Sequence, residues 1–277
     1  MNIDGSTAVL VHLAYPAAHL RTPQRFNPRC AERGVNAVLV PWQVRPEDLS
    51  ATMQALRKAE SLVGAIVTIP HKEKAARLCD RLDGVAAILE VANVIRRDAD
   101  GTLTGRILDG DGFIGGLHAR DVAIQGRSAL IVGAGGVALA IAAALIEAGI
   151  ARLRVANRTQ ARAEAMIARL RQFADGLGLT VALEVGAADP LGCDIAVNAT
   201  SLGMHEDDAL PMQIEKLGPG MTVAEVIMVP KITPLLREAE ARGAVIVPGD
   251  AMIAGQIDPF IDFVLGPAAS GTTGNTA

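Results

Sequence analysis

SALIVGAGGVALAIAAALIEAGIARLRVANRT, residues 128–159, is the stretch that decides the fold. The apolar run 128–132 leads directly into the turn Gly133-Ala-Gly-Gly-Val-Ala138, which is followed by a helical stretch, 139–148, and a second apolar run, 151–156. A strand, a GxGxxA turn, a helix and a second strand within about 30 residues are typical of a dinucleotide-binding βαβ unit. The glycines let backbone N–H groups approach a pyrophosphate, and the closing alanine lets the helix pack closely on the strand.

The end of the second strand indicates which dinucleotide binds. NAD sites usually have Asp or Glu there, about 20 residues after the turn, to bind the ribose 2′-hydroxyl. This chain has Asn157, Arg158 and Thr159, and Arg162 follows in the first turn of the next predicted helix. Because cations in a first helical turn oppose the helix dipole, two arginines there indicate that an anion binds, and the 2′-phosphate of NADP fits. Two solvated surface arginines are the alternative interpretation.

The composition limits the class of protein. The 277 residues are enough for two domains, and with 50% apolar but only 3% aromatic residues the cores must consist of Ala, Val, Leu and Ile. A net charge of −4 argues against a nucleic-acid partner. The three cysteines and five histidines show no metal-ligand spacing, and scattered cysteines fit a reducing compartment. With no N-terminal signal and no apolar run of about 18 residues, we expect a cytoplasmic protein with no membrane partner.

The residues before this unit predict a second, smaller α/β unit. Three apolar runs alternate with helical stretches, an order that implies a mainly parallel sheet covered by helices. Residues 92–108 are expected to form a hairpin. Lys72 lies just beyond the end of a predicted strand, where open α/β sheets bind ligands. The expected strands are 8–13, 36–40 and 64–69, and the expected helices are 24–33, 46–60 and 72–82.

The residues after Arg162 continue the alternation of helices and strands. The last predicted helix is followed by Gly266–Ala277, which is rich in Gly, Ala, Ser and Thr and is expected to be a disordered tail. The expected strands are 180–185, 195–198, 223–226 and 245–247, and the expected helices run to about 173 and over 233–242 and 249–264.

Separated motifs follow the same order as in shikimate dehydrogenases, and the chain resembles that family from about residue 8 to 265. The resemblance implies an α/β fold with an N-terminal substrate domain, which has a mainly parallel sheet, and a Rossmann-like NADP-binding domain. The substrate domain is expected over 1–108 and 251–277, and the NADP-binding domain over 109–250. The motifs are VTIPHKE (67–73), AN (92–93), DG (111–112), GAGG (133–136), NRT (157–159), NATS (198–201) and Gln256.

The resemblance also implies an activity, the reduction of 3-dehydroshikimate to shikimate by hydride transfer from NADPH. We expect a small-molecule substrate and a monomer or homodimer. Lys72 and Asp111 match the family's catalytic pair, and oxidation of a secondary alcohol does need a group that removes the hydroxyl proton. A helix dipole disfavours the ammonium form of a lysine at a helix start, and a carboxylate could orient that lysine.

The remaining site residues follow from the same resemblance. Those that match substrate-binding positions are Thr22, Thr68, Asn93 and Gln256. Asn198, Ala199, Thr200 and Ser201 are expected beside the nicotinamide half of the cofactor. The other residues expected at the cofactor are Gly133, Gly135, Gly136, Val137, Ala138, Asn157, Arg158, Thr159 and Arg162.

The chain departs from the family around the substrate carboxylate. The family loop normally has two serines, where this chain has Leu20 and Thr22, and Met228 takes the place of a tyrosine. Asp109 stands where the family usually has Asn. These departures leave open quinate or another cyclic hydroxy acid as the substrate. A non-enzymatic ligand-sensing module is a further alternative, although retention of the catalytic pair argues against it.

Asp109-Gly-Asp-Gly112 has an alternative interpretation as a cation-binding loop. Phe113, however, occupies the third ligand position of an EF-hand pattern. We therefore expect these residues to begin a short helix and expect no metal site.

Overall fold

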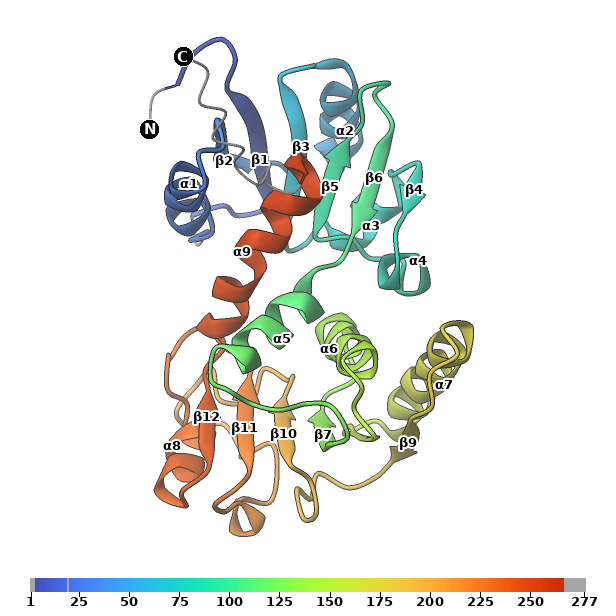
Figure 1. Ribbon diagram of the computed structural model, residues 1–277, viewed down its shortest axis with the longest axis vertical. Helices are drawn as coiled ribbons and strands as arrows, with labels where there is room; N and C mark the ends of the chain where they lie inside the picture. The colour runs from blue at the N-terminus through green and yellow to red at the C-terminus, as the bar shows by residue number, and fades with distance from the viewer. Residues whose placement is uncertain (1–2, 19, 267–277) are drawn as a thin grey trace, which may run out of the picture. The chain divides into compact units, whose positions relative to one another are not determined.

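The computed structural model describes residues 3–18 and 20–266, so the expected tail after Gly266 lies outside the described residues. The chain divides into two compact units, whose elements are labelled in Figure 1. The first contains the residues up to Ile107 and those from Ile257 onward. The second is continuous, from Leu108 to Gln256.

The first unit is built on a sheet of six strands within the described residues. They are β1 (Ala8–Ala14), β2 (Ala37–Gln43), β3 (Leu62–Val67), β4 (Arg81–Leu82), β5 (Val94–Arg97) and β6 (Leu103–Arg106). The order is β2-β1-β3-β5-β6-β4. β1 runs parallel to β2 and β3, whereas β5 and β6 form the predicted antiparallel hairpin. The sheet is therefore mainly parallel, as the sequence predicts.

Helices cover this sheet and close its core. They are α1 (Pro23–Glu32), the 3₁₀ turn η1 (Pro46–Asp48), α2 (Leu49–Lys58), α3 (Lys72–Arg77), α4 (Val85–Leu89) and the part of α9 (Asp250–Leu265) from Ile257 onward. Leu49 and Met53 of α2 pack with Leu13 of β1 in one core cluster. A Cβ on Gly64 of β3 would lie only 2.9 Å from Val264 Cγ1, so α9 packs directly on the sheet.

The helix expected over 72–82 is too long. α3 ends at Arg77, because Asp80 binds the neighbouring β6 on two sides. Its N–H donates to the Leu103 carbonyl at 2.9 Å, and its carboxylate accepts from the Leu103 N–H at 2.8 Å. These non-local bonds draw the next two residues into the sheet as β4, parallel to β6.

The second unit has a sheet in which every strand pairing is parallel. Its strands, within the described residues, are β7 (Ser128–Val132), β8 (Arg152–Ala156), β9 (Ala182–Val185), β10 (Ile195–Asn198), β11 (Thr222–Glu225) and β12 (Val245–Val247). The order is β12-β11-β10-β7-β8-β9, which is the 3-2-1-4-5-6 order of a Rossmann sheet counted from β7. The predicted nucleotide-binding fold is therefore confirmed. The chain reverses direction across the sheet between β7 and β10, where such sheets bind ligands.

The helices of the second unit are α5 (Asp109–His118), α6 (Gly136–Glu147), α7 (Gln160–Gly176), the 3₁₀ turn η2 (Ile214–Lys216), α8 (Pro234–Ala241) and the first part of α9. α6 is apolar around its whole circumference, which allows its residues from Ala138 to Ile146 to be buried on every side. A Cβ on Gly110 of α5 would lie 2.4 Å from the Ala140 carbonyl oxygen, so α5 contacts the backbone of α6. Among the described residues, no helix is both long and apolar enough to cross a membrane, and α6 has only 12 residues.

Candidate functional site

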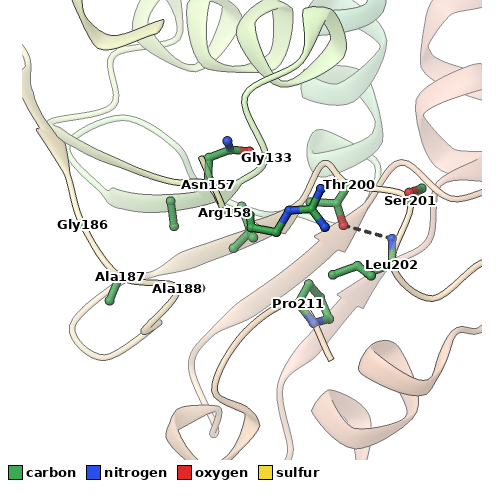
Figure 2. Close-up of a pocket in the computed structure, with 12 residues that line it drawn as sticks. Gly133, Asn157, Arg158, Gly186, Ala187, Ala188, Thr200, Ser201, Leu202 and Pro211 are labelled. Carbon is green, nitrogen blue, oxygen red and sulfur yellow. Dashed lines mark hydrogen bonds between the residues drawn. The ribbon is translucent and has the colours of Figure 1, made fainter. Parts of the chain in front are cut away.

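A pocket of about 500 Å³ opens in the second unit, where β7, β8 and β10 end (Figure 2). It lies at the reversal point of the sheet, where a doubly wound fold binds its ligand. Five lining residues are among those predicted to contact the cofactor: Gly133, Asn157, Arg158, Thr200 and Ser201. The others are Val132, Ala156, Gly186, Ala187, Ala188, Leu202 and Pro211.

The glycine turn after β7 leaves its backbone accessible. Gly133 has φ +119°, and a Cβ there would lie 2.7 Å from the Ala199 carbonyl oxygen, so only glycine fits. At Gly135 and Gly136 a Cβ would meet no atom of the described chain within 4 Å. These two residues begin α6, so open space surrounds backbone N–H groups at a helix start, as a pyrophosphate requires. Ala138 is fully buried, which fits its predicted packing role.

Arg158 supplies the positive charge of the pocket. It is the second residue after β8, is exposed, and extends its side chain over the pocket in Figure 2. Asn157 Nδ2 donates to the Thr159 carbonyl at 2.8 Å and so closes the turn that carries this arginine. Thr159 is the N-cap residue of α7, although its side chain makes no capping hydrogen bond within the described chain. Arg162 is exposed in the first turn of α7, outside the described pocket lining.

Asn198 is buried beneath the loop that forms one pocket wall. Its Nδ2 donates to Glu225 Oε1 at 2.8 Å and to the Leu202 carbonyl at 2.9 Å. Its Oδ1 accepts from Thr200 Oγ1 at 2.6 Å and from the Thr200 N–H at 3.1 Å. The amide thus uses both donors and both acceptor positions on protein groups. Asn198 therefore shapes the loop whose residues Thr200 and Leu202 line the pocket.

Glu225 is a functional candidate that the sequence analysis missed. It ends β11, is 1% exposed, and its Oε2 accepts from Thr233 Oγ1 at 2.6 Å. Burial raises the pKa of the Glu225 carboxyl, while the hydrogen bonds from Asn198 and Thr233 act against that rise. A charged residue that ends an apolar strand was the available signal. Its partner Asn198 becomes evident only from the β10–β11 register.

Three residues predicted for the substrate site lie at strand ends in the first unit's sheet. The Ala92 N–H donates to the Lys72 carbonyl at 3.2 Å, and the His71 N–H donates to the Thr68 carbonyl at 2.9 Å. Lys72, Thr68 and Asn93 are thereby brought to the end of β3 and the start of β5. Lys72 is half-buried and is the first residue of α3, while Asn93 is buried.

The loop before α1 has one of the two hydroxyl groups that the resemblance implies there. Thr22 is buried at the N-cap position of α1, and Leu20 is half-buried. Arg21 Nη1 donates to the Ala18 and Leu20 carbonyls, both at 3.1 Å, so this side chain folds back onto its own loop. In the second unit, Met228 is 37% exposed. Of the three positions at which the sequence analysis compares hydroxyl groups, only Thr22 therefore carries one.

Asp109 and Gln256 form a buried pair in the second unit. Gln256 Nε2 donates to Asp109 Oδ1 at 2.9 Å, and Gln256 makes no other side-chain hydrogen bond among the described residues. Gly112 makes room for this pair, since a Cβ there would lie 2.2 Å from Gln256 Cγ. Asp111 is exposed in the first turn of α5. Lys72 belongs to the first unit and Asp111 to the second, so their pairing stays a prediction.

Within the described ranges, no group of three or more His, Cys, Asp or Glu side chains could hold a metal ion.

Two family models match the chain. Residues 13–95 match the shikimate dehydrogenase substrate binding domain, and residues 117–184 match the shikimate / quinate 5-dehydrogenase model. The chain is 42% identical to a shikimate dehydrogenase (NADP(+)) of Rubrobacter xylanophilus over 255 residues, which are 91% of this chain and 88% of that protein.

Two solved structures are similar over nearly the whole chain. The ligand-free 5-ketofructose reductase of Gluconobacter sp. strain CHM43 has a TM-score of 0.86 at 26% identity, covering 96% of this chain and 95% of that one. Shikimate 5-dehydrogenase from Listeria monocytogenes, in complex with shikimate and NAD, has a TM-score of 0.85 at 26% identity, covering 98% and 96%.

Proposed function

The chain belongs to the shikimate dehydrogenase family, and we propose that it is an NADP-dependent oxidoreductase that interconverts 3-dehydroshikimate and shikimate. The observation that carries this proposal is the pocket at the reversal point of the second sheet. It combines an accessible glycine turn with Arg158 and has no acid at the end of β8. The Rubrobacter relative, which is named for NADP(+), supports the same cofactor.

The residues of the pocket fit NADP. Gly135 and Gly136 leave the space at the start of α6 that a pyrophosphate needs, and the Arg158 guanidinium suits a 2′-phosphate. When bound, NADP takes up or supplies the hydride. Thr200 and Ser201 hold the wall of the pocket formed by the loop after β10.

We assign the proton transfer to Lys72. Reduction of a ketone requires a proton on the oxygen as hydride reaches the carbon, and the reverse reaction requires its removal. The Lys72 Nζ donates that proton in its ammonium form and accepts it as the amine. Its place beside Thr68 and Asn93 supports this role. We propose that the Asp111 carboxylate orients the ammonium.

The same proposal gives the substrate hydroxyls to neutral polar groups. Thr68 and Asn93 are proposed to bind them from the first unit and Gln256 from the second, while Thr22 is proposed to bind the substrate carboxylate. Because Asp109 takes one N–H of the Gln256 amide, the amide oxygen and one N–H remain for a ligand. A substrate hydroxyl both donates and accepts, so it matches this pair.

The reduced set of hydroxyls favours a second candidate substrate class for the same machinery. Leu20 and Met228 replace groups that bind a carboxylate in the family, and the protein with a TM-score of 0.86 is named for a keto sugar. A polyhydroxy ketone without a carboxylate is therefore the alternative to shikimate and quinate.

A substrate panel separates these candidates. Steady-state reduction of NADP⁺ is measured with shikimate, with quinate, and with a neutral polyol. Shikimate is expected to give the highest kcat/KM, with a high KM because a buried carboxylate that lacks a partner costs about 1–3 kcal/mol. A higher kcat/KM for the polyol would replace the proposed substrate, and turnover of none of the three would refute the proposed function.

A further inference from the structure

A chain of hydrogen bonds leads from the interior of the second unit to the proposed cofactor pocket. It begins at Glu225 and passes through Asn198 to Thr200, which lines the pocket. Glu225 is 1% exposed, and both Asn198 and Thr233 are fully buried. These hydrogen bonds therefore lie in the protein interior, where an unsatisfied polar group is costly and the direction of each hydrogen bond is well defined.

Glu225 and two backbone groups together set the orientation of the Asn198 amide. An ionised carboxylate only accepts hydrogen bonds, and here its two oxygens accept from Asn198 Nδ2 at 2.8 Å and from Thr233 Oγ1 at 2.6 Å. Asn198 therefore turns its NH₂ group towards Glu225 and the Leu202 carbonyl, and its Oδ1 towards the N–H and hydroxyl of Thr200. A hydroxyl could not impose this orientation, because it can either donate or accept.

The orientation of Asn198 commits the proton of Thr200. The Thr200 hydroxyl donates to Asn198 Oδ1 at 2.6 Å, and its oxygen accepts from the Leu202 N–H at 3.1 Å, the bond drawn in Figure 2. A hydroxyl has one proton and two lone pairs. Towards the pocket, Thr200 is therefore left with one lone pair and no proton.

We propose that Glu225 is a positioning residue which, through Asn198, makes Thr200 an acceptor-only group in the pocket, so that this point binds an N–H or O–H group of the ligand and disfavours a phosphate. Arg158, in the same lining, offers only donors. A dinucleotide therefore places its phosphate at Arg158 and a sugar hydroxyl or carboxamide N–H at Thr200. This inference rests on the proposed function, because it takes NADP as the ligand.

Glu225→Gln tests the inference with little change in shape. The new amide can accept from only one of Asn198 and Thr233, so the other meets an N–H group. Where that N–H group meets Asn198, the Asn198 NH₂ group loses one of its two acceptors, and the hydrogen bond that keeps the Thr200 proton away from the pocket is weakened. The Kd for NADP⁺ is expected to rise about tenfold, with kcat at saturating NADP⁺ within about twofold of the unsubstituted protein.

The readout is direct NADP⁺ binding by the full-length chain, measured by calorimetry, together with KM and kcat. The matched control is Glu184→Gln, which removes a carboxylate from β9, where Glu184 pairs with Arg154, and should leave the Kd unchanged. In a Thr200→Val background, Glu225→Gln should no longer weaken binding. An equal loss in both backgrounds would mean a general structural defect and would overturn the proposal.

A second pair of variants covers the case in which Glu225→Gln does not fold. Thr200→Ser keeps the hydroxyl and should bind NADP⁺ within about twofold, whereas Thr200→Val should bind about tenfold more weakly. Equal binding by Thr200→Val and the unsubstituted protein would overturn the inference alone. Absence of NADP⁺ binding by the unsubstituted protein would instead overturn the proposed function and the inference with it.

Discussion

Gly112→Ala is expected to break the buried pair that holds Gln256. The added Cβ would lie 2.2 Å from Gln256 Cγ and 2.5 Å from the Met252 carbonyl oxygen, which belongs to the backbone of α9. The side chain of Gln256 must therefore leave its position, and its 2.9 Å hydrogen bond to Asp109 is lost.

The magnitude follows from three contributions. Loss of a hydrogen bond to a charged group costs about 1.5–3 kcal/mol, and overpacking costs about 1–3 kcal/mol. The better helix propensity of alanine returns up to about 1 kcal/mol. We expect the free energy of unfolding to fall by about 1.5–6 kcal/mol. The KM for shikimate should rise about tenfold, since the proposed substrate contact of Gln256 is lost.

The assay compares urea unfolding and steady-state kinetics with those of a matched glycine variant. A Cβ added to Gly176, the last residue of α7, would meet no described atom within 4 Å, so Gly176→Ala should be neutral or slightly stabilising. If Gly112→Ala were as stable as Gly176→Ala, with an unchanged KM, the packing argument for Gln256 would be refuted.

Three further substitutions test other parts of the account. Arg158→Ala should raise the KM for NADP at least about tenfold while the KM for NAD changes little, because a charge-assisted contact contributes about 1.5–3 kcal/mol; equal losses for both cofactors would contradict the 2′-phosphate assignment. Asp258→Asn should lower the free energy of unfolding at pH 7 by about 1 kcal/mol, since it removes the half-exposed ion pairs that Asp258 of α9 forms with Arg29 and Arg33. The Arg29 hydrogen bonds lower the pKa of Asp258, so this contribution is full above the unfolded pKa of about 3.9 and is lost as the pH falls through the folded value; urea unfolding at pH 7 and pH 3 should show the difference between variant and parent shrink in acid, and a constant difference would rule out the ion pairs as its cause. Leu20→Ser combined with Met228→Tyr should lower the KM for shikimate with little change in kcat, and an unchanged KM would show that these residues do not limit carboxylate binding.

The fold could be predicted from the sequence where the signals are local. The apolar run 128–132, the glycine turn and the next helix are adjacent in the chain, and the structure has them as β7 and α6. The alternation of strands and helices likewise predicted two α/β sheets. Local patterns failed where distant residues decide the structure, as at Asp80, whose hydrogen bonds to Leu103 end α3 early.

In the candidate site too, local signals could be predicted from the sequence, whereas contacts between distant residues could not. Arg158 was predicted because the second strand ends without an acid and two arginines follow it, and Arg158 lines the pocket. Glu225 was missed because its role depends on the register that pairs it with Asn198, 27 residues earlier. The contact between Gln256 and Asp109 joins residues 147 positions apart and requires a glycine between them in space. Such contacts depend on packing, which the order of residues alone does not reveal.

The measurement that tests the central claim most directly compares two lysines of α3 in shikimate oxidation by NADP⁺. Lys72→Ala should lower kcat by about 10²–10⁴-fold, the usual contribution of a general acid–base group, with NADP⁺ binding nearly unchanged. Lys74→Ala, which removes a lysine whose Nζ donates to the Pro46 carbonyl, should keep kcat within about twofold. A folded Lys72→Ala protein with the kcat of Lys74→Ala would contradict the assignment of proton transfer to Lys72.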